Sequence, residues 1–250
     1  MTAAVCIRTK HALSGSLLRF FLATAEDVPF RDIAALPEFG VHASGPLYSF
    51  LLSSPRSLAR MTRRLLESAG ASQSPLFLET EFSSLPARLM LLPGKQLREL
   101  AVYAGLTLHC RAVAAIVERV DVRALRVAFG DAAHQFAVLR APFFLRDPDH
   151  LALALGGVDA SGLRPEQARI EDLVSRVNLA GLACLSACAP ALPPALATLF
   201  ERKLAALSTG DTGIVHPAPV LEDGEKYSLH ALLTKLLRKE LEQKWNPSCS

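Results

Sequence analysis

The chain has 250 residues, of which half are hydrophobic and only 6% are aromatic. Leu and Ala dominate the apolar set while Val and Ile are comparatively sparse, and this balance favours helices over sheets. The formal net charge is +3, from 27 basic and 24 acidic residues spread along the sequence. This small excess of positive charge argues against a nucleic acid as a partner.

The cysteines are odd in number and widely dispersed, which is not the pattern of a disulfide framework. They are Cys6, Cys110, Cys184, Cys188 and Cys249. Near the start of the chain an apolar run over 17–23 is interrupted by Arg19 and is too short for the core of a signal peptide. We therefore expect a cytoplasmic protein with reduced thiols.

The first 93 residues are predicted to form an N-terminal helical and irregular lobe. Ser54 and Pro55 are typical of a helix start, and an apolar face follows them until Gly70. The opposite face of this helix carries a basic strip formed by Arg56, Arg60, Arg63 and Arg64. Such a strip either docks on an acidic partner or a membrane surface, or is simply the solvated face of the helix, which is the more common case. The segment 76–82 alternates apolar and polar residues in part and is compatible with one short strand.

A central helical core is predicted over 94–207, beginning with one long helix over about 95–120 whose apolar residues recur at helical spacing. Asp121 is predicted to cap a second helix that stops at Gly130, and Asp131 a third that ends at Pro142. The large apolar residues of these two helices are expected to face the long helix. They are Val122, Leu125, Phe129, Phe136 and Leu139.

The second half of this core contains the longest uncharged segment, 177–200, which has the length of a membrane span. Its prolines, Pro190, Pro193 and Pro194, favour two buried helices that meet at a proline turn. We expect these helices over about 165–188 and 195–207, after a loop at 147–149 and a break at Gly156 and Gly157.

The last predicted region, 208–250, contains a polar loop over 208–227 and an amphipathic helix capped by Ser228. The apolar side of this helix is formed by Leu229, Leu232, Leu233, Leu236, Leu237 and Leu241, and Trp245 lies at its end. The three regions are expected to form one continuous globular unit. The predicted fold class is mainly α, a compact multi-helix protein with a long central helix.

No residue pattern in the chain indicates catalysis, cofactor binding or metal binding. Cys184 and Cys188 lack further ligands at a compatible spacing, and His109 and Cys110 diverge on a helix, so packing explains them better. Neither phosphate-binding glycine motif occurs, nor do the HExxH and GxSxG motifs. One alternative stays open: an enzyme or regulator whose site is assembled from dispersed residues such as His109, His134 and Asp131.

The central block resembles the SctK family of type III secretion accessory proteins, which includes YscK and PscK. The resemblance lies in LRELAVYAGLTLHCRAVAAIV, followed by VDVRALRVAFGDAAHQFAVLRAP at 120–142. The N-terminal LLRFFL and the C-terminal LLTKLLRKELEQKW are also similar to the ends of that family.

The resemblance implies a non-enzymatic cytoplasmic adaptor at the cytoplasmic face of the inner membrane. Its partners would be an SctQ-like pod protein and the cytoplasmic domain of an SctD-like inner-membrane ring protein. The implied protein uses no cofactor, binds no nucleic acid and reaches the membrane through protein contacts only. The basic strip at Arg56–Arg64 is the candidate surface for a partner.

Overall fold

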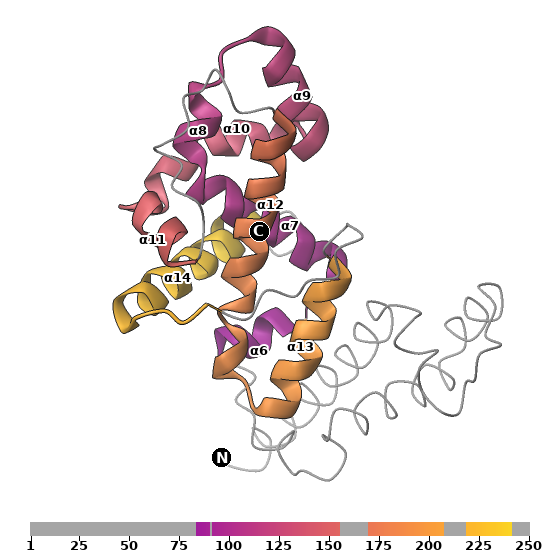
Figure 1. Cartoon of the computed structure of the whole chain (residues 1–250), viewed down its shortest axis with the longest axis vertical. Coiled ribbons are helices and arrows are strands. Elements are labelled where there is room, and N and C mark those ends of the chain that lie inside the picture. Colours follow the sequence, from indigo (N-terminus) through magenta and orange to yellow (C-terminus); the bar gives the residue numbers. More distant parts are fainter. Residues whose placement is uncertain (1–83, 91, 156–169, 208–218, 242–250) are drawn as a thin grey trace, which may run out of the picture. The chain divides into compact units, whose positions relative to one another are not determined.

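All the regular elements are helices in the computed structural model, which describes residues 84–90, 92–155, 170–207 and 219–241 (Figure 1). The α-helices are α6 (Leu85–Met90), α7 (Gly94–Leu108), α8 (Cys110–Ala115), α9 (Arg119–Phe129), α10 (Asp131–Leu139), α11 (Pro148–Ala154), α12 (Ile170–Ser186), α13 (Pro194–Leu207) and α14 (Asp223–Leu236). Two short 3-10 helices, η1 (Ala141–Phe143) and η3 (Ala189–Ala191), join some of them, and a π-helix, η4 (Leu237–Leu241), extends α14. The mainly α fold class is confirmed.

The chain divides into two units, which we describe separately. The first contains Met1–Gln96 and Ala189–Val215, and the second contains Leu97–Cys188 and His216–Ser250. The domain limits expected from the sequence, at 93 and 207, remain a prediction. The basic strip Arg56–Arg64, the strand considered over 76–82 and Trp245 lie outside the described residues.

In the first unit, α6 and α13 supply the described part of the core. Leu89 and Met90 of α6 are buried, as are Leu199 and Phe200 of α13.

The expected proline turn is confirmed, because α12 ends at Ser186 and α13 begins at Pro194. Among the described residues, one helical stretch, Ile170–Ala191, is long and apolar enough for a membrane span by composition, but 44% of its most apolar window is buried inside the protein.

In the second unit, the helix expected over 95–120 is interrupted at His109 and ends at Ala115. Leu108 closes α7 and Cys110 opens α8, while Ile116 is extended, with φ −81° and ψ 112°. Two residues before the interruption, the Thr107 hydroxyl donates to the Tyr103 carbonyl at 2.8 Å, a side-chain bond of the kind that bends helices. The break lets α10 pack against α8 as well as α9.

The caps predicted for the next two helices are wrong, although the helices exist. α9 begins two residues before Asp121, with Glu118 as its N-cap, and Gly130 rather than Asp131 is the N-cap of α10. Gly130 ends α9 as expected, with a φ of +88° that a residue with a Cβ rarely adopts. Its positive φ turns the chain sharply, so α9 and α10 pack against each other.

The expected packing of α9 and α10 is only partly correct. Leu125 and Phe136 are fully buried, Val122 and Phe129 are half-buried, and Leu139 is 58% exposed. Phe136 packs against Tyr103 of α7, with ring centroids 4.8 Å apart, and so anchors α10. Leu139 is exposed because α10 ends there and the chain turns into η1.

Two helix starts were also misread. The loop expected at 147–149 begins α11, because the Asp147 carboxylate accepts the His150 backbone N–H at 3.2 Å and Pro148 occupies the first turn. α14 begins at Asp223 rather than at Ser228, since the Glu225 carboxylate accepts the Glu222 backbone N–H at 2.8 Å. The leucine face of α14 and η4 is confirmed, and all six of its leucines are buried.

Candidate functional site

A close crossing of α7 and α12 forms the centre of the second unit. A Cβ added to Gly105 would lie 1.9 Å from the Val177 carbonyl oxygen, and one added to Gly181 would lie 1.9 Å from that of Ala101. The two helices therefore touch through their backbones at two glycines, one from each helix. The pairs 101–181 and 105–177 also show that the helices run antiparallel.

His109 continues this register by one turn beyond Gly105 and lies close to the start of α12. It is only 4% exposed, and its Nδ1 has no hydrogen-bond partner among the described residues. Burial, and next the positive charge of Arg176, lower the pKa of His109 below its ordinary value, while Asp149 opposes the shift. A neutral imidazole is thus favoured at this junction.

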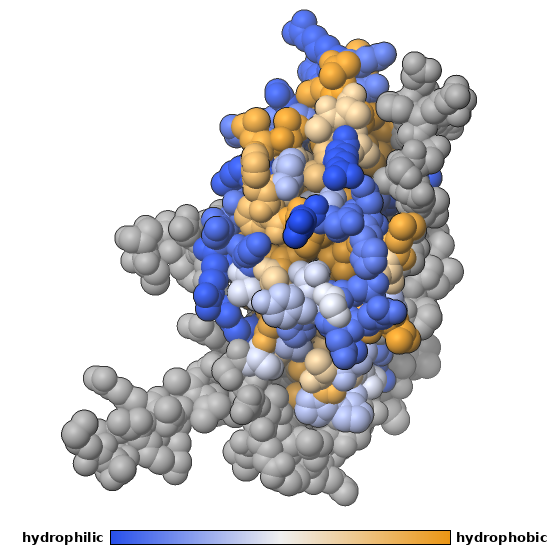
Figure 2. Space-filling model, turned by 90° about the vertical axis from the view of Figure 1, so that its left-hand side faces the viewer, coloured by the Kyte–Doolittle hydropathy of each residue, from blue (hydrophilic) through white to orange (hydrophobic). Residues whose placement is uncertain are grey.

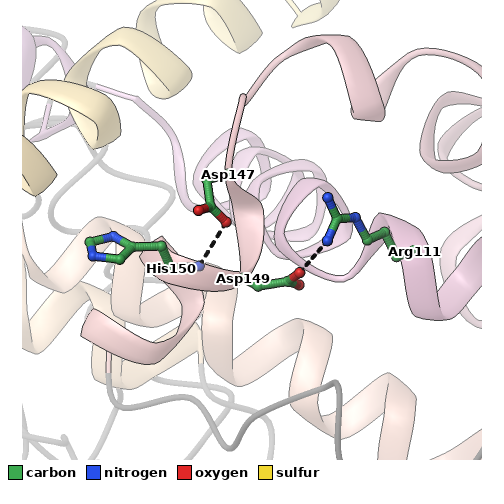
Figure 3. Close-up of polar contacts among 4 residues, drawn as sticks. All are labelled: Arg111, Asp147, Asp149 and His150. Carbon is green, nitrogen blue, oxygen red and sulfur yellow. Dashed lines mark hydrogen bonds and ion pairs between the residues drawn. The ribbon is translucent and has the colours of Figure 1, made fainter.

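An ion pair fixes the start of α11 against α8, next to this histidine. Arg111 donates to the Asp149 carboxylate at 2.5 Å, while Asp147 caps α11 from the other side of the same turn (Figure 3). The Arg111 side chain is 69% exposed and the Asp149 side chain 31% exposed. Solvent screens such a pair, so its role is chiefly to orient α11.

His134 and Asp131 lie together on α10, but His109 has a different set of charged neighbours. Burial and then Arg126 lower the pKa of His134, and Asp131 raises it in part. Asp131 itself is exposed and pairs with Arg126 at 3.7 Å. The two histidines have different charged neighbours: Arg176 and Asp149 act on His109, whereas Arg126 and Asp131 act on His134.

The described cysteines are packing residues, as expected. Cys110, Cys184 and Cys188 are each at most 1% exposed. Burial raises the pKa of all three thiols, that of Cys188 to about 12, so the thiolate is disfavoured. Among the described residues, no three His, Cys, Asp or Glu side chains are grouped so that they could hold a metal ion.

Lys203 is the buried charge that the sequence analysis missed. This residue of α13 is only 2% exposed, and its ammonium group donates to the carbonyls of Leu92 at 2.6 Å and Met90 at 3.3 Å. Met90 is the last residue of α6 and Leu92 lies two residues beyond it, where carbonyls lack intrahelical partners. The sequence pattern around Lys203 does not distinguish it from a surface lysine. What distinguishes it is its contacts with residues that are distant in sequence.

The comparisons with known proteins identify one family. A model of the family described as "YOP proteins translocation protein K (YscK)" matches residues 31–250. Neither a search of curated proteins nor a search of solved structures found a match. The family model spans most of the chain, including the central block that carries the resemblance seen in the sequence. The chain therefore belongs to the YscK (SctK) family of type III secretion proteins.

Proposed function

We propose that this component of a type III secretion system is a non-enzymatic adaptor of the cytoplasmic sorting platform. In this role it links the cytoplasmic domain of an SctD-like ring protein to an SctQ-like pod protein, at the cytoplasmic face of the inner membrane. The family match over residues 31–250 carries the proposal. The burial of the described cysteines agrees with it, since these thiols pack in the core.

Co-purification tests this function directly. The full-length protein is expressed with the SctQ-like and SctD-like proteins of the same secretion system, and each is expected to be retained by the tagged adaptor. Deletion of the gene is expected to stop secretion, and re-expression of the wild-type protein to restore it. The proposal fails if neither protein is retained and the deletion strain still secretes.

The basic strip Arg56, Arg60, Arg63 and Arg64 remains part of this proposal. Its arginines fall on one face of a predicted helix, and an acidic partner surface would complement their charge. Reversal of charge at Arg60 and Arg63 is expected to weaken retention of a partner without loss of thermal stability. Arg98→Glu, at an exposed position of α7, is the control. Unchanged retention would leave the strip as solvated surface.

A further inference from the structure

One exposed helix face in the second unit has a composition that its own packing does not explain. α9 packs on α10 and α12 through the side that contains the buried Leu125. Its opposite side carries Val120, which is 77% exposed, and Val127, which is 81% exposed. Val117, just before the helix, is 84% exposed. In Figure 2, hydrophobic and hydrophilic residues lie side by side at the end of the second unit where Figure 1 shows α9.

These valines are unfavourable where they stand. A β-branched side chain loses rotamer freedom in a helix, and an exposed one leaves apolar surface in water. Val120 and Val127 are seven residues apart, so they lie on one line along the helix, two turns from each other. No described part of the chain covers this line. A second helix laid along it would bury both side chains.

An arginine row runs beside the two valines. Arg119, Arg123 and Arg126 are exposed and spaced i, i+4 and i+7, which places them along one flank of the same face. Only Arg126 has an ion-pair partner within the described residues, the exposed Asp131 at 3.7 Å. The other flank holds Ala124 and Ala128, whose small side chains allow a close approach.

We propose that this face, the α9 face (Val117, Arg119, Val120, Arg123 and Val127), binds an amphipathic helix of another protein of the secretion apparatus. That helix would place apolar residues along the valines and Asp or Glu residues against the arginine row. Guanidinium groups recognise carboxylates through paired hydrogen bonds, so the arginines fix the orientation of the partner. The inference deepens the proposed function and rests on it for the origin of the partner.

A membrane surface fits this face less well. Helices that bind at the bilayer interface bury Trp, Phe or Leu, and the α9 face offers only three valines. Its apolar area suits one contact line with a helix rather than insertion among lipids. We therefore assign the α9 face to a protein partner, and the test below includes lipid binding as the alternative result.

Site-specific crosslinking in secreting cells tests the proposal. The full-length protein carries the photo-reactive residue p-benzoylphenylalanine in place of Val127, and the crosslinked peptide is identified by mass spectrometry. The expected product joins residue 127 to an acidic amphipathic segment of a secretion-apparatus protein. Its yield is expected to fall about tenfold or more in the double variant Arg119→Glu/Arg123→Glu, as for central interface residues. Binding of the purified partner should fall similarly in Val120→Asp/Val127→Asp.

The matched control is Arg146→Glu/Arg238→Glu, which reverses two exposed arginines elsewhere in the same unit. It is expected to leave the crosslink unchanged, and all variants should keep the wild-type melting temperature. The proposal is overturned if Arg119→Glu/Arg123→Glu leaves the crosslink intact, if the control lowers it equally, or if the product is a second copy of this chain.

Two further outcomes separate this inference from its alternatives. If residue 127 yields no protein adduct, and the protein sediments with phosphatidylglycerol vesicles unless Arg119 and Arg123 are reversed, the α9 face binds membranes and the inference is wrong. If neither the SctQ-like nor the SctD-like protein is retained and the deletion strain still secretes, the adaptor function fails. An adduct with an acidic helix of another apparatus protein would then still support the proposal that the α9 face binds such a helix.

Discussion

Lys203 shows how one side chain can complete a helix end. This buried lysine of α13 donates to the carbonyls of Met90, the last residue of α6, and of Leu92 just beyond it. Removing a charged donor from buried acceptors leaves those carbonyls without a partner, which costs more than the hydrogen bonds contribute on balance. The first unit depends on this residue for the junction of two helices that are more than a hundred residues apart in sequence.

Lys203→Met, which keeps most of the apolar stem, is therefore expected to destabilise the protein by about 2 kcal/mol. Urea denaturation measures the change in the free energy of unfolding. Lys95→Met removes an exposed lysine from the same unit and is expected to have little effect. Equal stability of the wild-type protein and Lys203→Met would show that the two hydrogen bonds contribute nothing on balance.

The two buried histidines give stability a pH dependence of definite sign. The ordinary pKa of histidine is 6.5, and burial lowers the pKa of both His109 and His134 in the folded state. Below pH 6.5 the unfolded chain therefore binds more protons than the folded one. The contribution of these two histidines to the free energy of unfolding should be complete above pH 6.5. It should decrease as the pH drops towards their pKa values in the folded state.

Denaturant titrations between about pH 7.5 and about pH 5.5 measure this slope. The variant His109→Gln/His134→Gln removes both groups, and its stability is expected to change less over the same range than that of the wild-type protein. A wild-type slope that survives in the double variant would assign the pH dependence to other groups.

At the scale of elements, the α7–α12 crossing depends on the absence of two side chains. Gly105 and Gly181 each face a backbone carbonyl that a methyl group would strike at 1.9 Å. A backbone cannot rotate out of the way as a side chain can, so the helices must separate. Helix propensity would favour the substitution of either glycine by Ala, because Ala is a better helix former than Gly by about 1 kcal/mol.

Gly105→Ala and Gly181→Ala are each expected to destabilise the protein by about 3 kcal/mol, the upper end of overpacking costs. Gly224→Ala is the matched control, because an added Cβ at this position in α14 meets nothing within 4 Å. That substitution is expected to stabilise the protein by roughly 0.5–1 kcal/mol. Chemical denaturation compares the three, and the crossing is misassigned if Gly105→Ala behaves like Gly224→Ala.

The start of α14 offers a second test at this scale. The Glu225 carboxylate accepts the Glu222 backbone N–H at 2.8 Å, whereas the Ser228 hydroxyl donates to the Gly224 carbonyl inside the helix. Glu225→Ala is therefore expected to cost about 1 kcal/mol, the usual value of a lost cap. Ser228→Ala should change stability by less than about 0.5 kcal/mol. If Ser228→Ala lowers the melting temperature more than Glu225→Ala does, Ser228 is the cap instead.

At the scale of the whole molecule, the buried thiols report on unfolding. Cys110, Cys184 and Cys188 all belong to the second unit and are inaccessible in the folded protein. In the variant Cys6→Ser/Cys249→Ser, these three are the remaining cysteines. Their reaction with a thiol reagent is expected to require unfolding and to follow the denaturation curve. Rapid labelling of any of them under native conditions would contradict their assignment to the core.

Local periodicity was enough for much of this protein. The leucine stripe of the last helix, the two helices that flank the proline turn and the stop at Gly130 all follow from spacing and backbone preference, and each is present. The family was recognisable for the same reason, since its pattern consists of apolar and small residues at helical spacing. These properties depend on neighbours a few residues apart, which the sequence displays directly.

Other features depend on contacts that spacing cannot reveal. The burial of Lys203 and the role of Gly105 are set by helices that arrive from distant parts of the chain. The same holds for α9, where the sequence shows valines and arginines but not which side is buried. The sequence by itself determined a helical protein of the YscK family. Only the tertiary structure decided which faces meet, because burial belongs to pairs of elements rather than to either one.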